Sequence, residues 1–323
     1  MTGNNKTYFW GDNRRYNAFA SRMKERFGGR IQKVSVNAGF TCPNRDGTKG
    51  YGGCIYCNNE SFTPSYCIED MNILSQLDKG ILFLQKRYKK IKHYVAYFQP
   101  FSNTYQTLDV LHMYYSQALN HELIDGLVIS TRPDCVDSTI LDYLRDLARD
   151  YLIFIEYGIE SCYDETLLKI NRCHTFQETE KAIEETKKRG LHTTGHIIFG
   201  LPGETKKSML EEAEILSRLP LSALKFHQLQ IINNTRMAEM YEKDPDIFFL
   251  FGLNEYIDFI IDFLEVLNPA ISVERLTSES PPRHRINPDW GNKRGDVIQK
   301  KIESVMEDRD TWQGKKFQNV PIR

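Results

Sequence analysis

Short apolar runs alternate along the chain with segments of helical period, and this alternation constrains the fold more than any other feature. The expected strands are 32–36, 94–98, 127–130, 152–156, 193–199 and 224–231, with 271–276 as a candidate late strand. The expected helices are 8–27, 73–88, 107–119, 139–149, 176–189, 205–219 and 255–267. Most of the strands are apolar throughout, which is typical of a parallel sheet covered by helices. The sequence therefore predicts an α/β fold, a partial TIM-type (β/α)6 barrel with a parallel sheet.

Extensions are expected at both ends of this barrel. Residues 1–30 are predicted as a basic N-terminal helical extension and residues 31–232 as the partial barrel. Residues 233–323 are predicted to add a helix, a strand and a basic tail that complete the side of the barrel. A chain of 323 residues is long enough for two domains, but α/β barrels of this length fold as one.

The composition is ordinary for a globular protein that is not embedded in a membrane. Hydrophobic residues make up 41% of the chain and charged residues 26%. No apolar run is long enough to span a bilayer, and the first residues do not resemble a signal peptide. We therefore expect a cytoplasmic protein with no membrane partner. In that reducing compartment the seven cysteines favour metal binding over a disulfide framework.

The net charge of −1 is unevenly distributed along the chain. Residues 1–33 hold eight Lys and Arg against two acidic residues, and residues 281–323 hold ten against six. The segment between them has a net charge of −11. Basic ends around an acidic body are consistent with a polyanionic partner. Solvated terminal helices and tails would produce the same pattern, so both interpretations stay open.

A glycine-rich loop after the first expected strand contains three cysteines. Eleven residues separate Cys42 from Cys54, and two separate Cys54 from Cys57. Thiolates select zinc or iron–sulfur clusters. Three thiolates hold three irons of a four-iron cubane and leave the fourth iron open, whereas an ordinary cluster of this kind takes four cysteines. The alternative is a structural zinc site with Cys67 as the fourth ligand.

This loop, placed after the first strand of a partial barrel, resembles the radical S-adenosylmethionine (SAM) superfamily. The resemblance implies a [4Fe-4S] cluster on Cys42, Cys54 and Cys57, with SAM chelated to the open iron. It also implies reductive cleavage of SAM to a 5′-deoxyadenosyl radical, with an electron donor such as flavodoxin or ferredoxin. The first gap of eleven residues is similar to that of the Elongator catalytic subunit. Tyr56 matches the aromatic position near the adenine of the cofactor.

Later strand ends extend the resemblance. The second strand end lacks the Gly-Gly-Glu segment that often binds the methionine amino group, so Ser102, Asn103 and Thr104 are the candidate acceptors, unless they only cap a helix. The third strand ends in Ser130 and a Thr-Arg-Pro-Asp segment similar to that of Elongator-type enzymes. Ser130 falls where relatives place a carboxylate near the cofactor. Arg132 is expected either to pair with an acid across the site or to form a structural ion pair.

The fourth and fifth strand ends supply the remaining motifs. Gly158 to Ser161 is similar to the family's Gly-x-Gln/Glu-Ser segment, which implies that Glu160 faces the ribose or amino end of SAM. The following Asn-Arg implies that Arg172 binds the methionine carboxylate. A Gly-Leu-Pro-Gly-Glu-Thr turn at 200–205 is a further family signal. Substrate candidates are Lys225, His227 and Gln228, whereas His174 is expected at a surface or a helix cap and Cys135, Cys162 and Cys173 as packed thiols.

The arrangement looks most like the bacterial MnmL-type branch near the Elongator catalytic subunit. That resemblance implies a tRNA substrate and conversion of 5-carboxymethylaminomethyl-uridine to 5-aminomethyl-uridine at the wobble position, with a downstream methyltransferase as a candidate partner. The aromatic and basic residues expected to contact RNA are Trp290, Trp312, Lys293, Arg294, Lys315 and Lys316. The two tryptophans serve equally well as anchors of the C-terminal tail. Two other functions stay open: a radical enzyme acting on a protein or small metabolite, and a non-enzymatic zinc protein that binds RNA.

Overall fold

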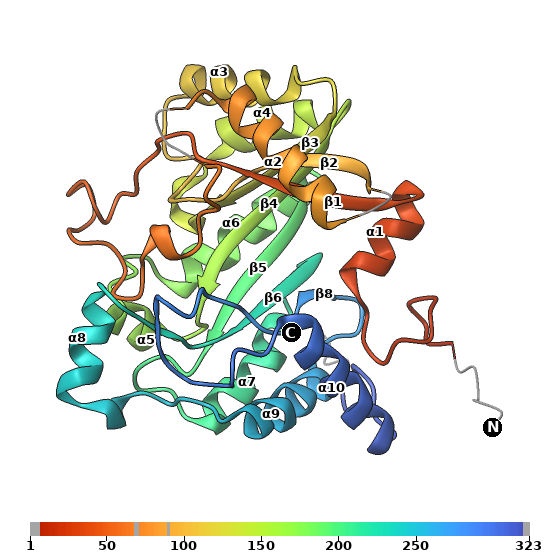
Figure 1. The fold of residues 1–323 in the computed structure, drawn as a ribbon, viewed down its shortest axis with the longest axis vertical. Helices are drawn as coiled ribbons and strands as arrows, with labels where there is room; N and C mark the ends of the chain where they lie inside the picture. Colours follow the sequence, from red (N-terminus) through yellow and green to blue (C-terminus); the bar gives the residue numbers. More distant parts are fainter. Residues whose placement is uncertain (1–6, 68–70, 89–90, 319–323) are drawn as a thin grey trace.

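A computed structural model describes residues 7–67, 71–88 and 91–318. Over these residues, seven parallel strands form one sheet in the order β1-β2-β3-β4-β5-β6-β8. Their bounds are β1 Arg30–Val36, β2 Ile91–Phe98, β3 Ile124–Thr131, β4 Leu152–Glu160, β5 His192–Phe199, β6 Ala223–Gln228 and β8 Ser272–Arg275. The sheet curls into a partial barrel (Figure 1). The predicted α/β partial TIM-type fold is confirmed.

Helices cover the outer side of the curled sheet (Figure 1). Those of the barrel are α2 Ile73–Arg87, α3 Leu108–Leu119, α4 Ser138–Leu147, α5 Asp164–Lys169, α6 Phe176–Lys188 and α7 Lys206–Ser217. Their starts follow local chemistry: Thr175 and Thr205 each form a capping box, in which the threonine side chain accepts the backbone N–H of the third helical residue. The main core fills the space between sheet and helices, where Ile129, Ile155 and Phe199 are fully buried. The continuous apolar runs are explained by this burial on both faces.

The N-terminal helix is shorter than the sequence predicts. Helix α1 spans only Phe19–Phe27, so the expected helix over 8–27 is wrong in its first half. Two interactions prevent a helix there: a local turn around Gly11, and a backbone bridge between Ala18 and a strand near the C-terminus. Gly11 has a φ of 95°, and Trp10 donates from its ring to Asp12 and to the carbonyl of Arg14, which fixes a turn. Ala18 is held extended by a bridge to Val273.

The C-terminal part confirms one expected helix and adds elements that the sequence did not indicate. Helix α9 Leu253–Val266 corresponds to the expected helix over 255–267. Helices α8 Arg236–Lys243 and α10 Gly295–Asp308 were not expected. The expected strand over 224–231 divides into β6 and the short β7 Ile231–Ile232, which pairs with β9 Arg285–Asn287 in a separate antiparallel ribbon. The candidate late strand is confirmed as β8, because its backbone pairs with β6 in the main sheet. No helix of the described residues is long and apolar enough to cross a membrane.

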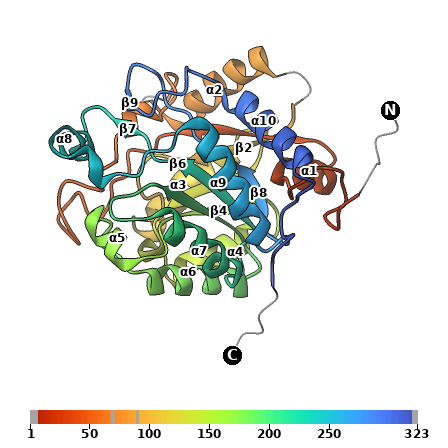
Figure 2. The ribbon, with the colours of Figure 1, turned by 90° about the horizontal axis from the view of Figure 1, so that it is seen from below.

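Both tryptophans make the packing contacts expected of anchors, the alternative that the sequence left open beside RNA contact. Trp290 is buried, donates to the carbonyl of Phe251 and packs against Tyr256. The ring of Trp312 contacts Tyr8. The N-terminal and C-terminal segments of the described residues also meet: the backbone N–H of Asn17 donates to Gln313, and α1 and α10 lie on the same side of the molecule (Figure 2). Both tryptophan rings therefore pack the C-terminal segment against the rest of the fold.

Candidate functional site

A cavity of about 540 Å³ opens at the carboxyl edge of the sheet and extends into the barrel. The cysteine loop and the ends of the strands line it, which is where barrel enzymes place their chemistry. Its lining falls into two groups. One group, which includes Glu160, lies around the cysteines. The other lies deeper on β1, β4, β5, β6 and β8, and we call it the floor: Lys33, Glu156, His196, Lys225, His227, Glu274 and Arg275.

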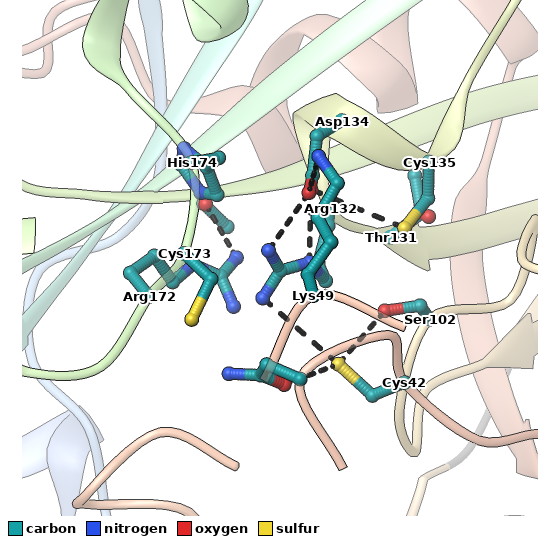
Figure 3. Close-up of polar contacts among 12 residues, drawn as sticks. Cys42, Lys49, Ser102, Thr131, Arg132, Asp134, Cys135, Arg172, Cys173 and His174 are labelled. Atoms are coloured by element: carbon teal, nitrogen blue, oxygen red, sulfur yellow. Dashed lines mark hydrogen bonds and ion pairs between the residues drawn. The ribbon is translucent and has the colours of Figure 1, made fainter. Parts of the chain in front are cut away.

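The three cysteines of the loop all line the cavity, and polar groups surround their sulfurs. Asn44 bridges two of them, because its Oδ1 accepts from Cys42 at 2.9 Å and its Nδ2 contacts the Cys54 sulfur at 3.5 Å. Ser102 contacts the Cys42 sulfur at 3.5 Å (Figure 3). Burial, and then the Cys54 sulfur, raise the pKa of Cys57. A thiolate at Cys57 therefore needs added positive charge nearby, which a metal centre supplies.

The geometry does not favour a zinc site built with Cys67. The Cys67 thiol donates to the carbonyl of Ser35 at 2.9 Å, against strand β1. Among the described residues, no three His, Cys, Asp or Glu side chains lie close enough together to hold a single metal ion. In a cluster each thiolate binds its own iron, so three separated sulfurs fit a cluster better than a single zinc.

Arg172 is fixed by the turn that follows helix α5. It donates to the carbonyl of Gly158 at 2.6 Å, contacts the Cys54 sulfur at 3.5 Å and lies 3.5 Å from Glu160. Although burial alone would lower it, the neighbouring Tyr56 and Cys54 raise the pKa of Arg172 well above its usual value. Asn171 and Cys173, on either side of Arg172, both have positive φ values. Backbone strain of this kind is typical of functional sites.

Three buried polar atoms of residues that line the cavity have no hydrogen-bond partner among the described residues. The Nε atom of Arg172, the hydroxyl of Tyr56 and the Nδ2 atom of Asn59 make no hydrogen bond to any described residue. Buried polar groups are normally paired, because leaving one unpaired costs about 1–3 kcal/mol. These atoms therefore fit a polar ligand such as SAM. Glu160, which also lines the cavity, has a φ of 68°, a strained conformation for a non-glycine residue.

Strand ends β2 and β3 provide only part of the expected contacts. Ser102, Ser130 and Arg132 line the cavity. Asn103 and Thr104 do not: Asn103 donates to the carbonyls of Phe98, Pro100 and Ser130, and the Thr104 hydroxyl is bonded to Thr131 and to the carbonyl of Cys135. The side chains of Asn103 and Thr104 thus support the wall of the cavity behind the site.

Arg132 forms a local ion pair and does not reach an acid across the site. Its guanidinium donates to both oxygens of Asp134, at 2.8 and 2.9 Å (Figure 3). Burial opposes the effect, but Arg132 and Lys49 lower the pKa of Asp134 to about 2. The Arg132 Nη1 atom still lies 4.0 Å from the Cys42 sulfur. Arg132 therefore places positive charge beside the cysteine loop.

The floor contains a charge network that the sequence reasoning mostly missed. Lys33 forms ion pairs with Glu156 and Glu274, and Lys225 lies 2.6 Å from Glu156 and 3.3 Å from Glu274. Burial would raise the pKa of Glu156, but Lys225 and Lys33 hold it well below its usual range. Lys225 was predicted as a substrate candidate. Glu156 has a weak sequence signal, a single acid at the end of the apolar run 152–155.

Two histidines and an arginine complete the floor. His196 lies 3.2 Å from Glu156 and stacks on His227, which is 2.6 Å from Arg275. Burial, and then nearby cations, lower the pKa of both histidines, so the two rings are neutral near pH 7. His227 lines the cavity as predicted. Gln228 does not, because its side chain bonds to Thr277 and Ser278.

The other three cysteines named as packed thiols, and His174, do not line the cavity and contact only neighbouring protein groups. Cys135 and Cys162 are buried, and Cys173 is half-buried beside Asn171. His174 is buried, not at the surface, and its Nδ1 atom lies 3.1 Å from the carbonyl of Thr175, the residue that caps α6. Burial, and then Arg172, lower the pKa of His174 to about 3.

Known proteins resemble this chain in sequence and in fold. The model of the radical SAM superfamily matches residues 39–216, more than half of the chain, and that of the radical SAM C-terminal domain matches residues 221–304. The chain belongs to the radical SAM superfamily. The uncharacterized protein YtqA of Bacillus subtilis (strain 168) is 31% identical over 320 residues, which cover 99% of this chain and 98% of YtqA.

More distant matches fall on Elongator-like proteins. The structure of Elp3 from Methanocaldococcus infernus, lacking its N-terminus, has the same fold, with a TM-score of 0.66 and 17% identity. The match covers 88% of this radical SAM chain and 64% of that one. The tRNA uridine(34) acetyltransferase of the same archaeon (strain DSM 11812 / JCM 15783 / ME) is 28% identical over 121 residues, which cover 36% of this chain and 22% of the acetyltransferase.

Radical SAM proteins bind a [4Fe-4S] cluster and SAM, and the residues of this cavity fit both. Cys42, Cys54 and Cys57 would hold the cluster, and the unpaired atoms of Tyr56 and Arg172 would meet SAM. When bound, the cluster supplies the electron that cleaves SAM to a 5′-deoxyadenosyl radical. The chain contributes the positive charge of Arg172 near the Cys54 sulfur.

Proposed function

We propose that this radical SAM enzyme modifies tRNA, converting 5-carboxymethylaminomethyl-uridine at the wobble position to 5-aminomethyl-uridine. The cysteine spacing and strand-end segments that resemble Elongator-type enzymes support the choice of substrate. The partial match to a protein named tRNA uridine(34) acetyltransferase supports the same nucleoside position. Removal of the carboxymethyl group converts the secondary amine of the substrate to a primary amine, which a downstream methyltransferase would accept. An electron donor such as flavodoxin or ferredoxin would reduce the cluster.

The observation that most supports a nucleic acid substrate is a set of arginines on segments that hydrogen bonds tie to the cysteine loop, directly at Met237 or through Asn233. Arg236, Arg283 and Arg285, the mouth arginines, lie on α8 and on the segment that includes β9. No carboxylate of a described residue lies within ion-pair distance of them. The backbone N–H of Met237 donates to the carbonyl of Ile55, which brings the start of α8 against the cysteine loop. Arg283 and Arg285 donate to the neutral side chains of His284 and Asn292. Cations without a carboxylate partner are suited to phosphates of an RNA whose base enters the cavity.

The four terminal cations predicted from the sequence are less suited to bind one RNA. Lys293 and Arg294 precede α10, whereas Lys315 and Lys316 follow it. A helix of 14 residues separates the pairs by roughly 21 Å, at 1.5 Å per residue. Arg294 and Lys316 also form ion pairs with Asp296 and Glu265. We therefore place the main phosphate contacts at the mouth arginines.

Conversion of the nucleoside tests the proposed function directly. The enzyme, purified without oxygen and reconstituted with iron and sulfide, is incubated with SAM, a chemical reductant and tRNA that bears the carboxymethylaminomethyl group. Mass analysis of the digested tRNA should show 5-aminomethyl-uridine with the wild type and none with Cys57→Ala. If SAM is cleaved but the nucleoside is unchanged, and tRNA from cells with and without the gene is identical, a protein or metabolite substrate replaces tRNA.

A further inference from the structure

The floor of the cavity holds more positive than negative charge. Lys33, Lys225 and Arg275 face Glu156 and Glu274, and the two histidines beside them are neutral. The two lysines and the two glutamates pair with each other. Arg275 is the cation left over, because no carboxylate of the described chain lies within ion-pair distance of it. Its Nη2 atom instead lies 2.6 Å from Nε2 of the neutral His227 ring.

The strand register explains why both Glu274 and Arg275 reach the cavity. Neighbouring residues of a regular strand point to opposite faces of a sheet. The pairing of β6 with β8 shifts between Leu224 and Lys225, and Arg275 then stands opposite Lys225. An irregularity of this kind redirects side chains at a strand end. As a result, an acid and a base adjacent in sequence both line the same cavity.

Glu274 has acceptor capacity that the protein does not use. Its Oε1 atom accepts from Lys33 and lies 3.3 Å from Lys225, whereas its Oε2 atom is buried and makes no hydrogen bond to a described residue. The floor therefore offers a guanidinium without an acid and a carboxylate oxygen without a donor. A ligand with a carboxylate and an ammonium group would provide an acid for the guanidinium and a donor for the carboxylate oxygen.

We propose that Arg275 and Glu274 form a subsite for a zwitterionic N-alkylglycine group, with the ligand's carboxylate on Arg275 and its ammonium on Glu274. The inference rests on the proposed function, because the carboxymethylamino group of that substrate is such a zwitterion. The subsite would fix the end of the uridine side chain at the floor, opposite the cysteine loop. Recognition then requires the group that the reaction removes, so the product, which lacks the carboxylate, is bound more weakly.

The test compares two tRNAs that differ only in the carboxylate. Reconstituted wild type should bind tRNA with the carboxymethylaminomethyl group about tenfold or more tightly than tRNA with the aminomethyl group, the effect of a charged hydrogen bond. Arg275→Gln should bind both equally, within about twofold, while retaining the wild-type affinity for the aminomethyl form. Arg149→Gln is the matched control, since Arg149 is an exposed arginine after α4 that pairs with Asp146.

Each outcome decides the subsite separately from the substrate. A preference that persists in Arg275→Gln would overturn the subsite and leave the tRNA function intact, as would a wild type that converts tRNA but binds both forms equally. If the wild type neither binds nor converts tRNA, the proposed function fails. The subsite is then decided by N-methylglycine against dimethylamine in ligand-observed NMR. Binding of N-methylglycine that Arg275→Gln abolishes supports it, and no binding refutes it. Unchanged iron content and circular dichroism verify that the variants are folded.

Discussion

Asn171 donates from its Nδ2 atom to the carbonyl of Gly53 at 2.7 Å, and this bond ties the turn that holds Arg172 to the cysteine loop. The carbonyl of Asn171 in turn accepts from Asn44, whose side chain bridges two of the cysteine sulfurs. The residues proposed to bind the cluster and those proposed to bind SAM are therefore joined by hydrogen bonds. A substitution at this junction should therefore affect the binding of both the cluster and SAM.

Asn171→Ala should weaken both cofactors' binding. The variant loses the bonds of the side chain and places alanine at a φ of 55°, a conformation that alanine disfavours. We expect SAM affinity to fall about five- to thirtyfold, for ~1–2 kcal/mol, with iron retained less well during gel filtration. Titration of SAM and iron analysis measure both effects. Asn171→Gly relieves the backbone and still lacks the side chain, so wild-type behaviour of this variant would show that the bonds are unimportant.

Replacing Cys42, Cys54 or Cys57 with Ala should abolish the cluster, because two thiolates do not retain a cubane. Cys67→Ala and Cys135→Ala are controls that should keep full iron content, since both thiols are directed elsewhere. Iron and sulfide analysis with visible absorption spectra gives the result. About four irons per chain in the triple alanine variant would refute the assignment.

Arg172→Ala should weaken SAM binding by about 1.5–3 kcal/mol, the range for a hydrogen bond to a charged group. Isothermal titration of SAM into the reconstituted protein provides the measurement. Arg189→Ala is the matched control, because Arg189 ends helix α6 and pairs with Asp142 and Glu185 away from the cavity. Equal affinity of Arg172→Ala and wild type would remove Arg172 from the cofactor site.

Replacing the three mouth arginines with Gln should weaken tRNA binding and flatten its dependence on salt, because each phosphate contact releases counterions. The quadruple variant of Lys293, Arg294, Lys315 and Lys316 should have the smaller effect, for the reasons of spacing and pairing given above. Filter binding at several salt concentrations compares the two. A larger loss in the quadruple variant would restore the terminal segments as the main contact. Cleavage of SAM by a chemical reductant should survive in both variants.

His174 should make the fold sensitive to acid. Its pKa is about 3 in the folded chain and about 6.5 when exposed, so between these values the unfolded state binds one more proton. Stability contributed by neutral His174 is therefore present above pH 6.5 and is lost as the pH falls toward 3. His174→Gln should flatten the fall of unfolding free energy in this window, by at most about 1.4 kcal/mol per pH unit. Denaturant unfolding of wild type and His174→Gln at several pH values measures this dependence. If the unfolding free energy falls equally steeply with pH in both, His174 is not the group that causes the fall.

The order of strands and helices was predictable because burial on both faces leaves continuous apolar runs. The helix over 8–27 was not, since Ala18 pairs with Val273, a partner 255 positions away that no local pattern reveals. The three cysteines, Arg172 and Glu160 were predictable because they lie in recognisable sequence motifs, and all of them line one cavity in the structure. The floor depends on curvature: Lys33 meets Glu156 and Glu274 only when the first, fourth and last strands of the sheet face one another.

The bridge between Ala18 and Val273, and the bond between Asn17 and Gln313, also order events during synthesis. The N-terminal segment leaves the ribosome first, yet its partners are translated near the end of the chain. Strand β6 therefore keeps an open edge until β8 emerges, and contacts between such distant residues form slowly. Glu274 and Arg275, which line the same cavity as Cys42, Cys54 and Cys57, therefore join it only after β8 has been translated.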